Sequence, residues 1–154
     1  MAKYNKRDAL QIIVSAAKEF EIKLKDKHFL IVYQENGKAK TVCVGFRDMN
    51  FLHMTGVKTK LSAQQFYSAC LDRKLSMVLP YLSILLYNNC MIGGFINSGI
   101  CIRADYFVGN TKAVLSVGFR TGKSVDFPVT LYSEDIRKLS HPTSKVLAIF
   151  VKDY

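Results

Sequence analysis

The feature that most constrains the fold is an Asn-Gly dipeptide at residues 36 and 37, which lies between two strand-like runs at residues 28–34 and 39–46. Asn-Gly readily adopts the positive-φ turn that joins adjacent antiparallel strands, and it is the strongest short-range signal for a β-hairpin. The first run, His-Phe-Leu-Ile-Val-Tyr-Gln, is apolar on both faces. Such a run predicts a strand with neighbours on both sides. The sequence therefore predicts a sheet that contains this hairpin.

An amphipathic helix is predicted ahead of the hairpin, over residues 6–20. Its apolar side chains recur at i, i+3, i+4 and i+7, the spacing that places them on one face of a helix. These positions are Leu10, Ile13, Val14 and Ala17. We therefore expect a helix that packs an apolar stripe against the sheet.

The remaining helices and strands are grouped rather than alternating. The pattern Ser62-x-x-Gln65 is a capping box, which predicts a helix, and Pro80 suits the first turn of another. Ser133 is a candidate cap for a short helical turn before the final strand. Four further strands are predicted at residues 99–109, 112–120, 125–132 and 145–152. This grouping favours an α+β fold in a single domain (1–154), with the N-terminal and central helices packed on a mainly antiparallel sheet.

The chain is strongly basic. Twenty-two Lys and Arg against 12 Asp and Glu give a formal net charge of +10 and a pI near 9.5. A positive field of this kind attracts polyanions and speeds their association. Nucleic acid is therefore the leading candidate partner, ahead of an acidic protein or an anionic membrane surface. The alternative is that the charge serves solubility alone.

The cysteines do not predict a metal site. Their spacing contains no C-x-x-C or H-x3-H pattern, so neither zinc binding nor a redox pair is indicated, and no cofactor is expected. They are Cys43, Cys70, Cys90 and Cys101. Free thiols among apolar neighbours favour a reducing, cytoplasmic setting.

Residues 75–102 carry no charged side chain, and the stretch is long enough for a transmembrane helix. Pro80, the Asn-Asn pair at 88–89 and the Gly-Gly pair at 93–94 interrupt it. The remaining pieces are too short to cross a hydrocarbon core of ~30 Å. A buried helix, a turn and a strand are predicted here, and no membrane partner is expected.

The stretch Asn-Phe-Leu-His-Met-Thr-Gly-Val at residues 50–57 contains the leading catalytic candidate, His53. Imidazole is the usual general base or acid at neutral pH. Thr55 supplies a hydroxyl nearby, and Lys58 and Lys60 supply positive charge. Together these groups can hold a phosphate and activate a hydroxyl beside it. The alternative is that His53 is a packing residue, because its neighbours are mostly apolar.

Two later strands carry a second group of candidate phosphate ligands. In residues 112–120 and 125–132, alternation places apolar side chains on one face and polar ones on the other. If the strands pair, one face presents Ser116, Arg120, Thr130 and Tyr132. Arginine with hydroxyl groups suits a phosphodiester, because guanidinium donates two parallel hydrogen bonds to phosphate oxygens. The alternative is an ordinary solvated sheet face.

The tetrapeptide Val-Gly-Phe-Arg occurs twice, at residues 44–47 and 117–120. The flanking sequences do not match, so no internal repeat is inferred. Each copy is expected to end a strand and deliver an arginine to the following loop. The second copy runs into Arg-Thr-Gly-Lys-Ser at 120–124, which ends like a P-loop. The first glycine of that motif is not in place and no helix signal follows, so nucleoside triphosphate binding is not predicted.

Residues 50–57, placed after a hairpin and before a helix that bears Phe66 and Tyr67, resemble the Phe-x-His-Leu-x-Gly element of phage- and mobile-element-associated nuclease-like domains. The superfamily of these domains groups barnase, EndoU, colicin and RelE ribonucleases. The similarity extends loosely from the first strand to the last, through residues 66–75 and 133–139. Met54 stands where the family pattern has Leu.

This resemblance implies metal-independent RNA cleavage on an α+β fold. In that chemistry a base takes the proton from the ribose 2′-hydroxyl, which attacks the adjacent phosphate, and cationic groups stabilise the transition state. The matching motif assigns a role only to His53, as general base or acid. From their chemistry we add Arg120 and Lys58 as catalytic candidates. The candidate substrate-binding residues are Lys60, Thr55, Ser116, Thr130 and Tyr132.

Two functions remain open at the level of sequence. The first is an RNA-cleaving toxin or mobile-element effector, for which RNA is favoured over DNA and an antitoxin or host protein is a further candidate partner. The second is a non-catalytic basic module of phage type that binds nucleic acid or inhibits a host nucleic-acid enzyme. In the second case His53 would be a packing residue.

Overall fold

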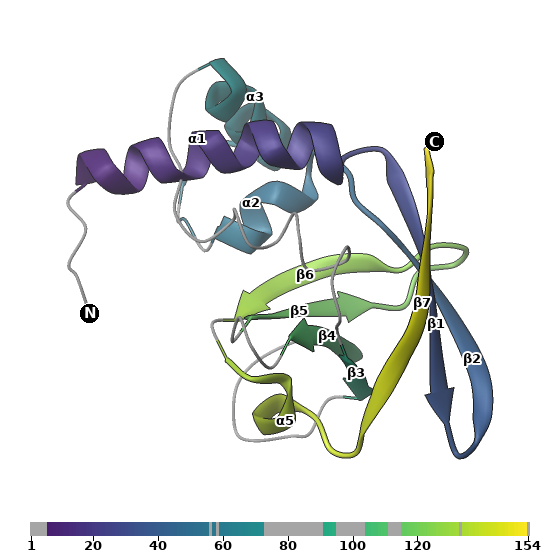
Figure 1. The fold of residues 1–154 in the computed structure, drawn as a ribbon. Coiled ribbons are helices and arrows are strands. Elements are labelled where there is room, and N and C mark those ends of the chain that lie inside the picture. The colour runs from purple at the N-terminus through teal and green to yellow at the C-terminus, as the bar shows by residue number, and fades with distance from the viewer. Residues whose placement is uncertain are drawn as a thin grey trace.

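The computed structural model describes residues 6–55, 57, 59–72, 91–94, 104–110, 115–132 and 134–153. The helices within these ranges are α1 (Lys6–Lys23), α2 (Asn50–Thr55), α3 (Ala63–Asp72) and α5 (Ile136–Leu139). The strands are β1 (Lys27–Glu35), β2 (Lys38–Gly45), β3 (Met91–Gly94), β4 (Tyr106–Asn110), β5 (Leu115–Arg120), β6 (Phe127–Tyr132) and β7 (Thr143–Asp153). Helices α1, α2 and α3 lie together at one end of the sheet, and α5 lies at the other (Figure 1).

The described strands form one antiparallel sheet in the order β2-β1-β7-β3-β4-β5-β6. The sheet curls until its two ends meet. Val44 of β2 forms a bridge with Asp126, the residue before β6. The Gly45 N–H donates to the Asp126 carbonyl oxygen and the Asp126 N–H donates to the Cys43 carbonyl oxygen, each at 2.8 Å. The predicted α+β fold, with helices packed on an antiparallel sheet, is confirmed.

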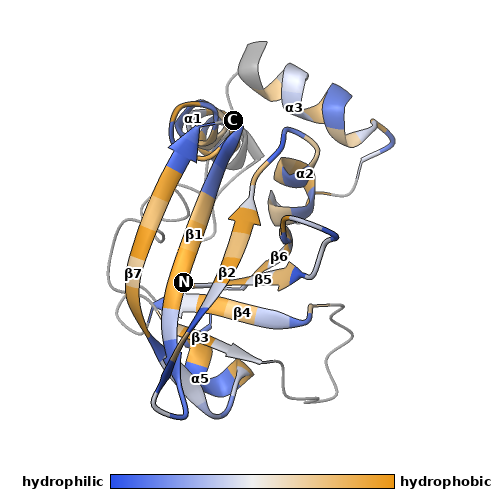
Figure 2. Ribbon diagram, turned by 90° about the vertical axis from the view of Figure 1, so that its right-hand side faces the viewer, coloured by the Kyte–Doolittle hydropathy of each residue, from blue (hydrophilic) through white to orange (hydrophobic). Residues whose placement is uncertain are grey.

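The predicted hairpin forms as expected. Asn36 and Gly37 have φ angles of 50° and 73°, the left-handed values that an Asn-Gly turn requires. Strand β1 pairs with β2 on one side and β7 on the other, so its predicted interior position is confirmed. Apolar residues run along the middle of β1 and β7 and along the second half of β2 (Figure 2). Phe29 and Ile31 on one face of β1 are buried, whereas Leu30 on the other face is 40% exposed.

The capping box before α3 is also present. The Gln65 N–H donates to Ser62 Oγ (3.2 Å), and the Ser62 N–H donates to Gln65 Oε1 (3.0 Å). These two reciprocal bonds satisfy donors that the first turn of a helix leaves unpaired.

The secondary structure differs from the prediction at three places. The His53 stretch, for which no helix was predicted, forms the short helix α2, and β3 includes the Gly-Gly pair at 93–94 that was expected to interrupt the uncharged stretch. The N-cap of α5 is Asp135, whose side chain accepts from the Arg137 N–H (2.9 Å), whereas Ser133 lies outside the described residues. The helix predicted from Pro80 also lies outside them.

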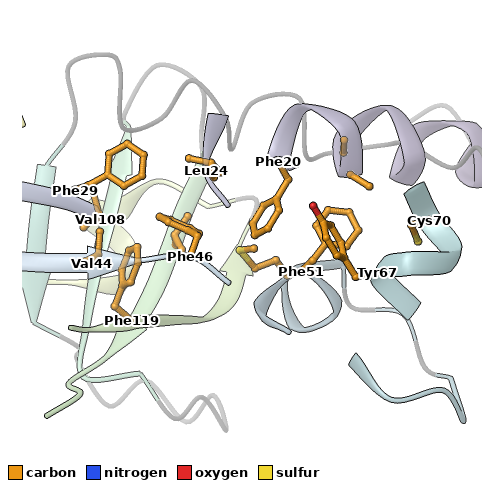
Figure 3. Close-up of a cluster of buried hydrophobic side chains, with 14 of the residues drawn as sticks. Phe20, Leu24, Phe29, Val44, Phe46, Phe51, Tyr67, Cys70, Val108 and Phe119 are labelled. Atoms are coloured by element: carbon orange, nitrogen blue, oxygen red, sulfur yellow. The ribbon is translucent and has the colours of Figure 1, made fainter. Parts of the chain in front are cut away.

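A continuous row of aromatic side chains joins the sheet to the helices (Figure 3). Phe46, which follows β2, lies at its centre. Its ring meets those of Phe29 in β1, Phe119 in β5 and Phe20 in α1 at centroid distances of 5.7, 6.0 and 6.1 Å. All four rings are buried, and each contributes about 1.5–3 kcal/mol through removal from water. Phe46 and Phe119 are the phenylalanines of the two Val-Gly-Phe-Arg copies, so the repeated tetrapeptides meet in the core.

A smaller core lies on the other face of β4, β5 and β6. There Phe107 and Ala104 pack with Ile136 and Leu139 of α5. Helix α5 therefore covers the part of the outer face near β3 and β4, while α1 and α2 cover the end of the inner core. No helix within the described ranges is long and apolar enough to cross a membrane. Most of the uncharged stretch at residues 75–102 lies outside those ranges.

Candidate nucleic-acid site

A pocket of about 330 Å³ opens where the two ends of the curled sheet meet. We call it the seam pocket. It is built from the start of β1, the end of β2, the turn into α2 and the loop between β5 and β6. The residues whose chemistry is used below are His28, Arg47, Asn50, Lys123, Ser124 and Phe127. These residues come from three segments that are distant in the sequence.

His28 enters the seam pocket from β1, where it lies opposite Gly45 in the register with β2. The imidazole and the Val125 side chain both pack against the Gly45 backbone. A Cβ atom at position 45 would lie 2.9 Å from His28 Cδ2 and 2.8 Å from Val125 Cγ1. Such contacts are too short for carbon atoms, so the absence of a side chain at Gly45 allows the imidazole to lie at the seam.

The loop between β5 and β6 is held by carboxylates. Asp105 Oδ2 accepts from the Thr121 N–H (2.7 Å), and Asp126 Oδ1 accepts from the Gly122 N–H (3.0 Å). The Tyr106 hydroxyl donates to Asp126 Oδ2 (2.7 Å). Both oxygens of Asp126 therefore accept hydrogen bonds from the protein. Burial, and then this bond to Asp126, raise the pKa of Tyr106 above its ordinary value, so the phenol remains a protonated donor.

Lys123 and Ser124 are exposed at the tip of this loop. Among the described residues, no carboxylate forms an ion pair with Lys123. The turn is tight, because a Cβ atom at Gly122 would lie 2.0 Å from the Val125 carbonyl oxygen. The acidic side chains of the loop thus shape its backbone, while its ammonium and hydroxyl groups face solvent beside the pocket.

Arg47 reaches the seam pocket from the turn between β2 and α2. Its N–H donates to Asn50 Oδ1 (2.8 Å), and the Asn50 N–H donates to the Arg47 carbonyl oxygen (3.0 Å). Asn50 is buried, so these bonds fix the backbone of the turn while the arginine side chain is exposed. The guanidinium also borders a shallow depression formed with Lys25, Asp26 and Asp48.

Arg120, a predicted catalytic residue, does not itself line the seam pocket but pairs with a residue that does. It is the last residue of β5, is exposed, and lies opposite Phe127 of β6. Opposite residues of an antiparallel pair share one face, with Cβ atoms about 4.5–5.5 Å apart. Phe127 itself lines the pocket, with 39% of its surface exposed. The arginine of the first Val-Gly-Phe-Arg copy thus lines the seam pocket, and the arginine of the second lies opposite a lining residue.

His53 lies on the surface rather than in the core. It occupies α2, and the residues of this helix that are buried are Asn50, Phe51 and Met54. Asn50, which lines the seam pocket, is one turn before His53 in α2, but Asn50 is buried whereas His53 is exposed. His53 is not among the residues that line the seam pocket.

The other candidates near His53 are not all part of a site. Thr55 Oγ1 donates to the Leu52 carbonyl oxygen (2.8 Å) and accepts from the Val57 N–H (3.2 Å), so its hydroxyl helps to end α2. Lys60 is exposed between α2 and α3. Lys58 lies outside the described residues.

The predicted pairing of the two later strands is present, but their polar face is covered. Ser116 lies opposite Tyr132, and Gly118 lies opposite Thr130. Ser116 is fully buried, and its hydroxyl donates to the Glu134 carbonyl oxygen (2.8 Å). The Tyr132 ring packs edge-on against Phe107, with centroids 6.3 Å apart. Because α5 covers this face, Ser116, Thr130 and Tyr132 do not form an open phosphate site with Arg120.

Sequence reasoning missed most of the seam pocket. His28, Lys123, Ser124 and Phe127 received no role, and Arg47 was noted only as the end of a repeated tetrapeptide. Two signals pointed toward the site: the strand-ending arginines and the Arg-Thr-Gly-Lys-Ser loop. Neither shows that residues 28, 47 and 123 meet, because their proximity depends on closure of the sheet.

Comparison with family models places part of the chain in a known group. Residues 12–78 match the model described as phage-Barnase-EndoU-ColicinE5/D-RelE like nuclease4. The predicted resemblance is confirmed. The match covers somewhat less than half of the chain, from α1 to beyond α3, and includes His28, Arg47 and His53. Comparison with curated proteins and with solved structures gives no significant match to either.

The match supports a nuclease-type function, and with it an interaction with nucleic acid, at the level of the family. It ends before the loop that carries Lys123. Within the described ranges, no group of three His, Cys, Asp or Glu residues gathers as a metal site.

Proposed function

We propose that this protein binds single-stranded RNA at the seam pocket and cleaves it without a metal ion. The observation that carries this proposal is the convergence of His28, Arg47 and Lys123 with the exposed ring of Phe127 in one pocket. The family match to nuclease-like domains supports the reaction class. The formal net charge of +10 supports binding to a polyanion.

The pocket offers separate groups for the phosphate and for the base. Arg47 donates two parallel hydrogen bonds to phosphate oxygens, and Lys123 adds a point charge. Arg120, on the face shared with Phe127, extends this positive border. The Phe127 ring provides a stacking surface for an unpaired base, an interaction worth about 1–3 kcal/mol per base. Unstacked bases of this kind occur in single-stranded RNA.

Cleavage requires one group to remove a proton and one to return it. In our proposal an imidazole takes the proton of the ribose 2′-hydroxyl, and the oxygen attacks the adjacent phosphorus. The bond from phosphorus to the 5′-oxygen breaks, and a second group protonates that oxygen, leaving a 2′,3′-cyclic phosphate. His28 in the pocket and His53 one turn along α2 from Asn50 are the two imidazoles that we assign to these steps. DNA lacks the 2′-hydroxyl, which is why we propose RNA.

The test is a cleavage assay with total RNA in EDTA, run beside thermal unfolding. His28→Gln and His53→Gln preserve side-chain polarity but cannot transfer protons at neutral pH. We expect wild type to cleave and each variant to lose at least about a hundredfold in rate, a typical contribution of one acid or base. Lys18→Ala, on the exposed side of α1, serves as the control.

Two results would change the proposal. If wild type binds RNA but never cleaves it, the chain is the non-catalytic binding module. If His53→Gln retains full activity while His28→Gln does not, His53 has no part in the reaction, and a different acid must be sought around the pocket.

The biological setting that we propose is a toxin or mobile-element effector. Growth arrest on induced expression, absent in His28→Gln, is the expected result. A protein that relieves the arrest by binding the seam pocket would act as the antitoxin.

A further inference from the structure

A second pocket, of about 390 Å³, lies in the mouth of the curled sheet. We call it the mouth pocket. It is formed by the far end of β1, by β3 and β4, and by the residues that lead into β7. The residues that carry the argument are Tyr33, Glu35, Gly94, Tyr106, His141 and Ser144. Mouths of barrels and the ends of curled sheets are frequent sites for small ligands.

Strand alternation explains why these side chains face the inside. Tyr33 and Glu35 follow the fully buried Ile31 at steps of two along β1, so all three point to the inner face. Tyr106 lies opposite Gly94 in the pairing of β3 with β4, and therefore shares that face. The sheet thus brings one carboxylate and two aromatic rings to a common opening.

The floor of the mouth pocket is aliphatic and aromatic. Val42 and the buried Ile92 contribute aliphatic surface. The Tyr106 ring stacks on Phe119 with a centroid distance of 5.7 Å and an interplanar angle of 18°. Because its hydroxyl is bound to Asp126, Tyr106 offers the pocket a ring face rather than a free hydroxyl. Such a floor accepts a planar ring.

Gly94 leaves part of the floor open. A Cβ atom at this position would have no heavy atom within 4 Å. A ligand can therefore approach the backbone of β3 closely at this point.

The rim of the mouth pocket is polar. Glu35 forms an ion pair with Lys40, but a carboxylate has about four acceptor positions, so it can accept further N–H donors. His141 is exposed at the rim. It follows the buried Ser140, whose hydroxyl donates to the Gly93 carbonyl oxygen (3.1 Å) and holds this segment against β3. Ser144 adds a hydroxyl opposite Ile92.

We infer that the mouth pocket binds a nucleobase. A nucleobase is a planar ring with apolar faces, and its N–H edge matches the acceptor oxygens of Glu35. Its faces pack against Tyr33 and the floor around Tyr106, while Gly94 gives its edge access to backbone. The site is separate from the seam pocket, and this inference does not depend on RNA cleavage.

Calorimetric titration with adenosine, cytidine, guanosine and uridine tests the inference. Nucleosides have no phosphate, so the cations of the seam pocket do not explain their binding, and a loss in Glu35→Gln distinguishes the mouth pocket from stacking on Phe127. We expect saturable binding of at least one nucleoside to wild type, and at least about tenfold weaker binding to Glu35→Gln, because the amide presents donors to an N–H edge. Glu19→Gln, on α1 and in an ion pair with Lys23, is the matched control and should bind like wild type.

Gly94→Val gives a second test that does not alter charge. Its side chain enters open space, so the fold should be retained while the pocket is filled. Loss of nucleoside binding at an unchanged melting temperature is expected. Absence of nucleoside binding to wild type, or equal binding by wild type, Glu35→Gln and Gly94→Val, would overturn the inference.

The source of the base is distinguished by a parallel titration with trinucleotides in which each ribose is 2′-O-methylated. Tighter binding of a trinucleotide than of its nucleosides, with the same loss in Glu35→Gln, identifies a base within a strand. Equal affinities identify a free nucleoside as the ligand. Both results support the base pocket.

Discussion

The seam pocket predicts a defined change in the salt dependence of RNA binding when Arg47 and Lys123 are both replaced by Ala. Both side chains border the pocket, and both are proposed to contact phosphate. On single strands, each phosphate contact contributes about 0.7 to the slope of log Kd against log salt concentration. Removal of two contacts should therefore lower that slope by about 1.4, with weaker binding to every RNA sequence.

The assay is fluorescence anisotropy with a 2′-O-methylated oligoribonucleotide, which cannot be cleaved, at several salt concentrations. The matched control is Lys18→Ala with Lys38→Ala. It removes the same formal charge from exposed positions on α1 and on the hairpin, away from the seam. The control should change the slope by less than about 0.3. Equal slopes for wild type and the pocket variant, or an equal fall in the control, would refute the reasoning, because binding would then follow net charge alone.

Three further predictions concern the framework of the site. Tyr106→Phe should reduce the decrease in the free energy of unfolding that occurs above about pH 10. The pKa of Tyr106 is higher in the folded chain than in the unfolded chain, so this group stabilises the fold below about pH 10 and ceases to do so as the pH rises. The measurement is urea unfolding at several pH values. If wild type and Tyr106→Phe lose the same free energy of unfolding above about pH 10, the prediction is wrong. Gly45→Ala should displace the His28 ring, seen as a shifted imidazole NMR signal and weaker RNA binding; unchanged spectra would contradict the packing at the seam. Phe20→Ala should lower the free energy of unfolding by about 3–5 kcal/mol in urea titrations, whereas a loss below about 1 kcal/mol would show that the aromatic row is not the main core.

Local signals in the sequence were sufficient for much of the fold. The Asn-Gly turn, the capping box at Ser62 and the apolar stripe of α1 each act over a few residues, and each formed as predicted. Helix α2 was missed for the opposite reason. Six residues are too few for a helix to form by propensity, and α2 depends on the Arg47–Asn50 hydrogen bonds and on burial of Phe51 and Met54.

The candidate site was harder to predict because it depends on contacts between distant segments. Strand alternation correctly placed Ser116 opposite Tyr132, yet it could not show that α5 covers that face. His28 becomes a site residue only because the bridge between Val44 and Asp126 closes the sheet. The exposure of His53 likewise follows from how α2 packs, which its apolar neighbours in sequence do not reveal.

Photocrosslinking tests the central claim most directly. An oligoribonucleotide that carries 4-thiouridine would be irradiated in complex with the full chain, and the modified peptides mapped by mass spectrometry. We predict crosslinks in the peptide that contains Lys123 and Phe127 and in the peptide that contains Arg47 and Asn50, reduced by prior replacement of Arg47 and Lys123. Crosslinks confined to α1, to the tip of the hairpin or to α5 would contradict the assignment of the seam pocket as the RNA site.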